Sequence, residues 1–219
     1  MPLTPDLLQM TPFYGFFHCL AKGVYDACFR GEVTGTEHIP ATGPFLIASS
    51  HSSLLDPPIV GCQVGRQMRF FARKTLWNTR VFSWWLNKVE TIPVDRDSGD
   101  VAAIRRVLQA LHEDRAVVLF PEGTRSPDGQ LQKPKAGVGL LACKTGAPVV
   151  PCRIYGSHEA FGKGTKIPRF GTPVTVVFGP PITAAEYDSP NSGKERYQIA
   201  SQRIMERIAA LPRPQYPVV

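Results

Sequence analysis

A histidine and an aspartate lie five positions apart in the stretch SSHSSLLDPP, residues 49–58, which follows a short apolar run. On a straight helix, residues at this spacing point about 140° apart, so His51 and Asp56 can meet only across a tight loop. Asp56 precedes a proline, which disfavours helical backbone at Asp56. This favours a helix that begins at Pro57, with Asp56 as its N-cap.

Such a loop would bring the Asp56 carboxylate to one imidazole nitrogen of His51. An anion there fixes the tautomer of the ring and stabilises its protonated form, which leaves the second nitrogen as a general base for a hydroxyl group. The alternative interpretation is structural: Asp56 only caps a helix, and His51 only fills a polar loop.

A second polar segment, LFPEGTRSPDG at residues 119–129, contains two prolines and two glycines that favour a rigid turn. The turn would expose Glu122, Thr124, Arg125 and Ser126. The Arg125 guanidinium could hold a phosphate through two parallel hydrogen bonds, while Glu122 could bind a hydroxyl or orient Arg125. The segment is equally compatible with an ordinary strand-to-helix connection that carries a surface salt bridge.

A third segment, TIPVDRDSG at residues 91–99, places Arg96 directly after a short apolar run. Arg96 would supply a further cation, with Asp95 as the group that orients it. Adjacent aspartate and arginine residues are also common on protein surfaces, so this segment carries weight only together with the other two.

The elements that must position these residues alternate along the chain. Apolar runs predict strands at 45–50, 69–72, 91–94, 116–120, 147–154 and 173–178, and helical periodicity predicts helices at 57–65, 76–88, 98–113 and 136–145. Ser192 and Glu195 form the pattern of a capping box that opens a last helix. This alternation predicts an α/β fold, a single layered domain with a mostly parallel central sheet flanked by helices.

In such sheets, ligands bind beyond the carboxyl ends of the strands. The loops after Ser50, Val94 and Phe120 are therefore expected along one rim of the sheet. This is the prediction that brings the three polar segments together.

The N-terminal residues 7–29 are apolar and aromatic, but His18, Lys22 and Asp26 interrupt them. A membrane-spanning helix needs about 20 nearly uninterrupted apolar residues, so one or two amphipathic helices lying in a membrane interface fit better. Packing of this segment on the domain is the alternative. We therefore divide the chain into an N-terminal interfacial helical segment, residues 1–30, and an α/β domain, residues 31–219.

The composition limits the compartment and the partners. The chain has 219 residues and a formal net charge of +7, which favours an anionic partner such as nucleic acid, anionic lipid or a phosphorylated substrate. Its five cysteines are scattered and form no metal-ligand pattern, which argues for a reducing compartment and against a disulfide or zinc framework. No cleavable signal peptide is recognisable.

Residues 61–88 combine basic and aromatic side chains without any acidic residue, and they include all three tryptophans. This composition suits stacking on single-stranded nucleic acid or anchoring on anionic lipid, and some of the aromatic residues could equally belong to the core.

Four ordered blocks of this sequence resemble those of the glycerolipid acyltransferase family, whose best-known members are the 1-acylglycerol-3-phosphate acyltransferases. The blocks are His51-x4-Asp56, Ile92–Arg96, Phe120–Ser126 and Val150-Pro151, and they lie between residues 45 and 156. Lys135-x-Gly137 also resembles a family element. Glu90 and Ser50 depart from the residues frequent in the family, which leaves the acceptor more open than the reaction.

The resemblance implies a role for each matched residue. His51 would activate the acceptor hydroxyl, and Asp56 would be its partner. The remaining residues would bind the two substrates. Arg96, Glu122 and Arg125 would bind the acceptor phosphate and glycerol, Gly123 and Thr124 would shape that pocket, Pro151 would lie on the donor side, and Arg73 or Lys74 and Lys135 would supply further basic positions.

The resemblance further implies an O-acyltransferase that moves a fatty acyl group from acyl-CoA or acyl-carrier protein to a lysophospholipid. The expected acceptor is 1-acyl-sn-glycerol 3-phosphate, which would give phosphatidic acid. A thioester already has a good leaving group, so no covalent enzyme intermediate is required, and no metal or redox cofactor is expected. The expected location is peripheral or monotopic, on the cytoplasmic face of a membrane, with no nucleic acid as partner.

Two alternatives stay open. The first is the same chemistry on glycerol 3-phosphate, another lysophospholipid or a lyso-aminolipid. The second is a non-catalytic basic module that binds lipid or nucleic acid.

Overall fold

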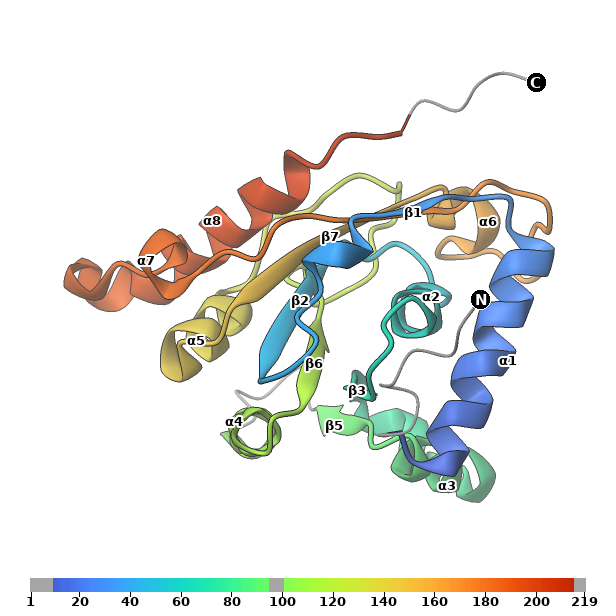
Figure 1. The fold of residues 1–219 in the computed structure, drawn as a ribbon, viewed down its shortest axis with the longest axis horizontal. Helices are drawn as coiled ribbons and strands as arrows, with labels where there is room; N and C mark the ends of the chain where they lie inside the picture. The colour runs from blue at the N-terminus through green and yellow to red at the C-terminus, as the bar shows by residue number, and fades with distance from the viewer. Residues whose placement is uncertain (1–9, 95–100, 215–219) are drawn as a thin grey trace.

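A computed structural model describes residues 10–94 and 101–214, which form a six-stranded sheet with helices on both faces (Figure 1). The sheet contains β1 (Val33–Thr34), β2 (Phe45–Ser49), β3 (Met68–Arg69), β6 (Ala116–Leu119), β7 (Val149–Tyr155) and β8 (Thr175–Phe178) in the order β1-β8-β7-β2-β6-β3. All neighbours are parallel except β7 and β8. The predicted α/β fold with a mostly parallel sheet is confirmed.

The central strand β2 is apolar on both sides because two separate cores cover it. Leu46 and Ala48 belong to the core under α4 (Val101–His112), α5 (Ala136–Thr145), α7 (Ala184–Tyr187) and α8 (Arg196–Ala209). Phe45 and Ile47 belong to the core under α1 (Pro12–Cys28), α2 (Asp56–Cys62) and α6 (Ser157–Phe161). Alternate side chains therefore anchor β2 from both faces, which fixes the point where the polar loop after Ser49 begins.

Two predicted strands leave the main sheet. The predicted strand 69–72 is two short strands, because β3 pairs with β6 whereas β4 (Phe71–Arg73) pairs with β5 (Ile92–Val94) in a separate two-stranded sheet. β2 and β6 are neighbours in the main sheet, so the loops that follow them emerge at one edge, as predicted. The loop after Val94 follows the small sheet instead, and residues 95–100 lie outside the described residues.

The first helix, α1, contacts the domain along one side and leaves another side exposed. Tyr14 and Tyr25 are buried, and the Tyr25 hydroxyl donates to the carbonyl of Val174 at 2.7 Å. Phe16 and Leu20 are exposed on the same helix. Figure 1 shows the first turns of α1 beside η3 (Lys74–Asn78) and α3 (Arg80–Lys88), which replace the single predicted helix 76–88. Over residues 10–94 and 101–214, no helix is both long and apolar enough to cross a bilayer.

Two predicted helix starts differ from the structure. Asp56 is the first residue of α2 rather than its N-cap, because its carboxylate accepts the N–H groups of Ser52 and Ser53 upstream instead of those of the first turn. The predicted capping box at Ser192 and Glu195 is wrong. Those residues belong to the short helix η4 (Pro190–Glu195), and the positive φ of Gly193 interrupts that helix. α8 begins only after η4.

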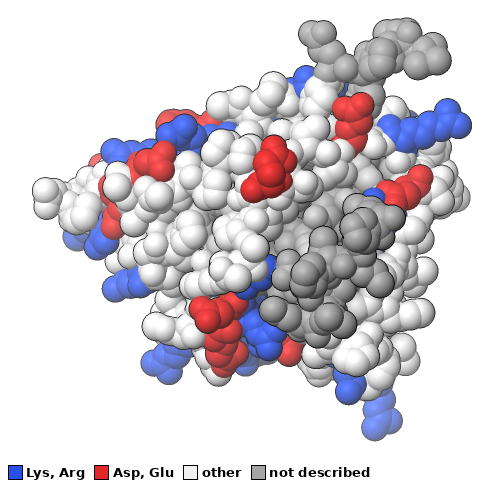
Figure 2. All heavy atoms as spheres, in the orientation of Figure 1, with Lys and Arg blue, Asp and Glu red and all other residues white. Residues whose placement is uncertain are grey.

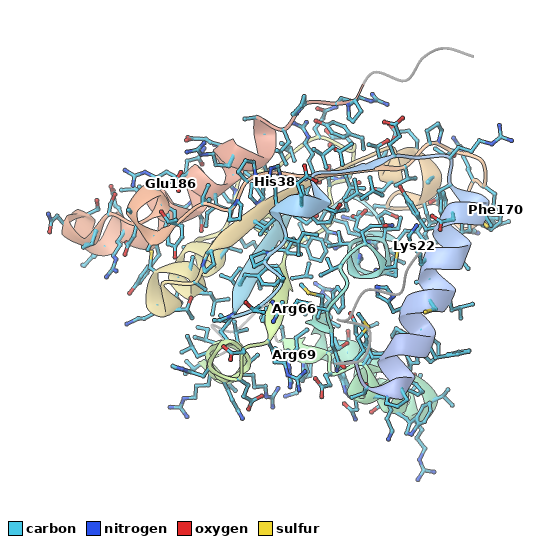
Figure 3. All side chains as sticks on the ribbon, viewed as in Figure 1. Lys22, His38, Arg66, Arg69, Phe170 and Glu186 are labelled. Carbon is cyan, nitrogen blue, oxygen red and sulfur yellow. The ribbon has the colours of Figure 1, made fainter. Side chains whose placement is uncertain are left out.

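The side chain of Arg66 also connects two loops at the edge of the sheet. Arg66, labelled in Figure 3, donates to the carbonyls of Pro40 at 3.1 Å, Gly43 at 2.9 Å and Asp114 at 2.9 Å. One guanidinium thus joins the loop before β2 to the turn before β6. The remaining short helix, η2 (Thr36–His38), lies between β1 and β2 in the chain.

Candidate functional site

The loop between β2 and α2 brings His51 and Asp56 together, as the spacing argument required. His51 Nδ1 lies 2.9 Å from Asp56 Oδ2, and the same oxygen accepts the N–H groups of Ser52 and Ser53, each at 2.7 Å. Asp56 is fully buried, and only 7% of the His51 surface is exposed. One carboxylate oxygen therefore closes the loop and orients the imidazole at the same time.

His51 is held by its ring and by its backbone. The ring stacks on Phe120 with centroids 4.1 Å apart and planes inclined by 24°. The backbone N–H of His51 donates to Glu122 Oε1 at 2.9 Å, and the backbone carbonyl of His51 accepts the N–H of Ser126 at 2.8 Å. Because Nδ1 is engaged with Asp56, Nε2 is the ring nitrogen left for a proton transfer.

Glu122 is a buried carboxyl group that joins the two polar loops. Its Oε1 accepts the His51 N–H, and its Oε2 accepts the N–H of Gln132 at 3.1 Å. Burial raises the pKa of Glu122 from its ordinary value of 4.5 to about 7. The two N–H donors oppose this rise in pKa, and the nearby Asp56 adds to it. Both carboxylate oxygens are thus engaged with backbone, which suits a positioning role.

The turn after β6 requires a glycine and is closed by its own backbone. Gly123 has φ +68°, and a side chain there would meet the aliphatic part of Lys135, with a Cβ only 2.9 Å from Lys135 Cδ. The N–H of Lys135 donates to the carbonyl of Pro121 at 2.9 Å, so the two ends of the loop 121–135 meet.

The start of α5 is in turn fixed by α8. The Ser201 hydroxyl accepts the N–H of Gly139 at 2.8 Å and donates to the carbonyl of Lys135 at 2.9 Å. A Cβ at Gly139 would lie 2.0 Å from the carbonyl oxygen of Tyr197, so only glycine permits this approach of the two helices. The loop that carries Glu122 therefore ends on a rigid helix pair.

A cavity of about 250 Å³ opens beside these residues and includes His51 and Glu122 in its walls. Its other walls come from the end of β7, the start of α6, residues 129–131 and the segment after α8. Arg153, Tyr155 and Arg213 line it, together with His158 and Glu159. The imidazole of His51 and two arginines thus share one polar cavity, which can accept an anionic substrate with a reactive hydroxyl.

The other predicted site residues lie outside the walls of this cavity. Thr124 and Lys135 are exposed and Arg125 is half-buried, while Arg73 and Lys74 are exposed at the end of β4 and the start of η3. Pro151 is buried in β7 opposite Ala48 of β2. Arg96 lies outside the described residues.

Sequence reasoning missed the cations of the cavity. Arg153 and Tyr155 lie two positions apart in β7, so their side chains share one face of the strand. Arg153 is the single arginine of this largely apolar run, which was an available signal for a strand end that faces a ligand. Arg213 lies in the segment LPRPQ after α8, where no local pattern marks it. Only the tertiary structure brings Arg213 to the same cavity.

Comparisons with known proteins find a matching family model, similar sequences and a similar structure. The family model described as Acyltransferase matches residues 30–155, which include the loops that carry His51, Asp56 and Glu122. A 1-acyl-sn-glycerol-3-phosphate acyltransferase of Bacillus subtilis is 30% identical over 185 residues, which cover 82% of this chain and 87% of that protein.

A chloroplastic 1-acyl-sn-glycerol-3-phosphate acyltransferase of Brassica napus is 28% identical over 79% of this chain and 52% of its own length. The chain therefore spans about half the length of this plant relative. Among solved structures, the 1-acyl-sn-glycerophosphate acyltransferase PlsC of Thermotoga maritima matches with a TM-score of 0.70 and 25% identity, covering 89% of this chain and 77% of that one.

Proposed function

This chain belongs to the acyltransferase family, and from that premise we propose that it transfers a fatty acyl group from a thioester to the hydroxyl of a lysophospholipid. The observation that carries the proposal is the contact of 2.9 Å between His51 Nδ1 and Asp56 Oδ2, beside a cavity that His51 and two arginines line. The proposed acceptor is 1-acyl-sn-glycerol 3-phosphate, because the relatives of comparable length and fold carry that activity in their names.

The proposed chemistry is direct transfer. His51 Nε2 takes the proton of the acceptor hydroxyl as the oxygen attacks the thioester carbonyl. The tetrahedral centre then expels the thiolate, which receives the proton from the imidazolium. Asp56 keeps Nδ1 protonated and offsets the positive charge that develops on the ring, and no covalent enzyme intermediate, metal or redox cofactor enters these steps.

We assign Glu122 a positioning role in this reaction. Its carboxylate holds the His51 backbone from one side, and Ser126 holds it from the other. Arg125 and Arg96 remain the proposed ligands of the acceptor phosphate, with Gly123 and Thr124 shaping that side of the site. Arg73, Lys74, Lys135 and Pro151 remain proposed substrate contacts at its margins.

The proposed location is the cytoplasmic surface of a membrane. Exposed apolar residues gather on α1, η3 and α3. They are Phe16, Leu20, Val24, Leu76, Val81, Phe82 and Trp84. Figure 2 shows mostly uncharged atoms over α1 and Lys and Arg atoms at the edge beside α3, which suits anionic lipid. We call this set of residues the aromatic–basic surface, together with the exposed Arg73, Lys74, Arg80 and Lys88.

The two tryptophans of α3 differ within this surface. Trp84 is 54% exposed and Trp85 is half-buried. Both pack edge-on against α1, Trp84 against Phe13 at 5.2 Å and Trp85 against Phe17 at 5.7 Å. Both tryptophans thus join α3 to α1, and Trp84, the more exposed of the two, is the side chain proposed to enter lipid.

A free-thiol assay with acyl-CoA and 1-acyl-sn-glycerol 3-phosphate tests the proposal. The unmodified chain should release thiol only when the acceptor is present, and His51→Ala should lower kcat by about 10²–10⁴-fold, the usual contribution of a general base. His112→Ala, an exposed histidine at the end of α4, is the matched control and should keep full activity. Thiol release that survives the loss of His51 would refute the mechanism, and no acceptor-dependent release would refute the function.

A further inference from the structure

The end of strand β7 forms a projecting wall beside the proposed general base. β2 ends at Ser49, opposite Cys152 of β7, and β7 continues to Tyr155. At about 3.3 Å per residue, these last three residues extend about 10 Å past the end of β2. All three line the cavity that contains His51. The cavity therefore continues away from the reacting atoms along this wall.

Two guanidinium groups meet on one aromatic ring at this wall. The Arg153 guanidinium lies 4.8 Å from the centre of the Tyr155 ring, and that of Arg213 lies 5.7 Å from the same centre. Arg153 and Tyr155 of β7 also form hydrogen bonds with the end of α8 and the segment after it. Arg153 donates to the carbonyl of Ala209 at 2.7 Å, and the Tyr155 hydroxyl donates to that of Leu211 at 2.6 Å. These bonds position Arg213 over the cavity.

Within the described residues, the charges of this cluster lack an anionic partner. Among the described residues, no carboxylate lies within ion-pair distance of Arg153 or Arg213. Two acidic residues line the cavity, but Glu122 is engaged with backbone N–H groups and Glu159 is exposed. Two like charges on one ring repel each other, and a phosphate between them would relieve that repulsion through charge-assisted hydrogen bonds.

We propose that Arg153 and Arg213 bind a phosphate group of the acyl donor, coenzyme A or the phosphopantetheine of a carrier protein, in the reaction proposed above. In the acceptor, the phosphate is attached to the carbon next to the reacting one, so it must lie close to His51. In the donor, the pantetheine arm separates the thioester from its phosphates, which suits a cation pair further along the wall.

The direction of the wall supports the donor as well. The segment after α8 lies at the edge of the molecule opposite to α3 in Figure 1. A lysophospholipid must keep its acyl chain near the aromatic–basic surface, whereas the nucleotide part of coenzyme A is water-soluble and can enter from the other side. The residues near the arginines are mostly polar, which does not suit an acyl chain.

Steady-state kinetics of Arg213→Gln and Arg153→Gln test the proposal with two donors. Each variant should raise the KM for acyl-CoA about tenfold, the loss expected for one charged hydrogen bond, and leave kcat and the KM for the lysophospholipid within about twofold. The KM for acyl-N-acetylcysteamine, a thioester without phosphates, should not change. Lys144→Gln, which removes an exposed positive charge from the last turn of α5, is the control for net charge.

Three results would overturn the proposal: a higher KM for the lysophospholipid alone, which would assign the pair to the acceptor phosphate; an equal rise with the phosphate-free donor; or no change in either variant. Arg213 extends from the segment after α8, so Arg213→Gln should fold normally, and thermal unfolding checks this.

Titration calorimetry with coenzyme A separates this proposal from the proposed function. The unmodified chain should bind coenzyme A about tenfold more tightly than Arg213→Gln, even if it released no thiol in the assay. Equal binding by both proteins would refute the cation pair whatever the activity.

Discussion

At the scale of single residues, one oxygen atom of Asp56 has two tasks that substitution can separate. Asp56→Asn keeps an oxygen for the N–H groups of Ser52 and Ser53 but removes the negative charge. We expect kcat to fall at least about 10²-fold, because the imidazolium loses its partner, while the KM values change little. Steady-state kinetics on both substrates measures this.

Asp56→Ala removes the loop closure as well as the charge. The free energy of unfolding should fall by about 3 kcal/mol, since hydrogen bonds to a charged group contribute about 1.5–3 kcal/mol each. Urea unfolding of both variants checks the difference. Equal stability of the Asn and Ala variants would contradict the closing role of the carboxylate.

Glu122 gives a second prediction at this scale, for the dependence of stability on pH. Burial raises its pKa from 4.5 to about 7, so between these pH values the folded chain keeps a proton that the unfolded chain has released. Its contribution to the free energy of unfolding therefore falls as pH rises through this window. Glu122→Gln carries no titrating group at this position.

Urea unfolding at pH 5 and pH 8 measures this effect. The unfolding free energy of the unmodified chain minus that of Glu122→Gln should be smaller at pH 8, by an amount on the order of 2 kcal/mol. A difference that stays constant between the two pH values would show that Glu122 does not titrate in this range.

At the scale of elements, the structure contains a capping box at Thr183 and Glu186, whereas the predicted one at Ser192 and Glu195 does not form. The Glu186 carboxylate accepts the N–H of Thr183 at 2.9 Å, and the Thr183 side chain in turn caps α7. Thr183→Ala should lower the free energy of unfolding by about 1 kcal/mol. Ser192→Ala should change it by less than about 0.5 kcal/mol, because Ser192 caps no helix. Denaturant unfolding of the two variants measures both changes in the free energy of unfolding.

The elements that could be predicted from sequence are those whose own residues determine them. β2, β6 and α5 have apolar runs or helical periodicity that local reasoning reads directly, and α5 begins and ends where predicted. The division of residues 69–72 between two sheets could not be predicted, because it depends on which distant strand each half pairs with. Gly193 interrupts the predicted capping box through its backbone conformation, which the serine–glutamate pattern does not encode.

The same distinction applies to the site. His51, Asp56 and Glu122 were predicted because their sequence neighbours, the prolines and glycines, define the loops. Arg153 and Arg213 were not, because their proximity arises from the docking of α8 and of the segment that follows it. The predicted grouping with Arg125 is not seen in the cavity, where Arg125 forms no part of the wall.

At the scale of the whole molecule, the aromatic–basic surface predicts binding to anionic vesicles. Val81 is 80% exposed and Trp84 54% exposed, and both lie on α3 among basic residues. The double variant Val81→Ser/Trp84→Ser should weaken sedimentation with phosphatidylglycerol vesicles at least about tenfold, because two large apolar side chains lose their burial in lipid. Added salt should weaken binding further.

Val101→Ser is the matched control for that measurement. Val101 is 59% exposed on α4, outside this surface, so its loss should leave vesicle binding unchanged. An equal loss of binding in both variants would mean that general surface hydrophobicity, rather than this face of the molecule, determines the association.

The hydrogen bond between Lys135 and Pro121 joins the two ends of the loop that carries Glu122. Because its ends meet, the segment between them can vary in length at its tip without moving strand β6 and helix α5, which flank it. A chimaera joined at these two positions should exchange the whole segment as a cassette between relatives. Acceptor preference would then become a trait that can be transplanted and measured on an unchanged scaffold.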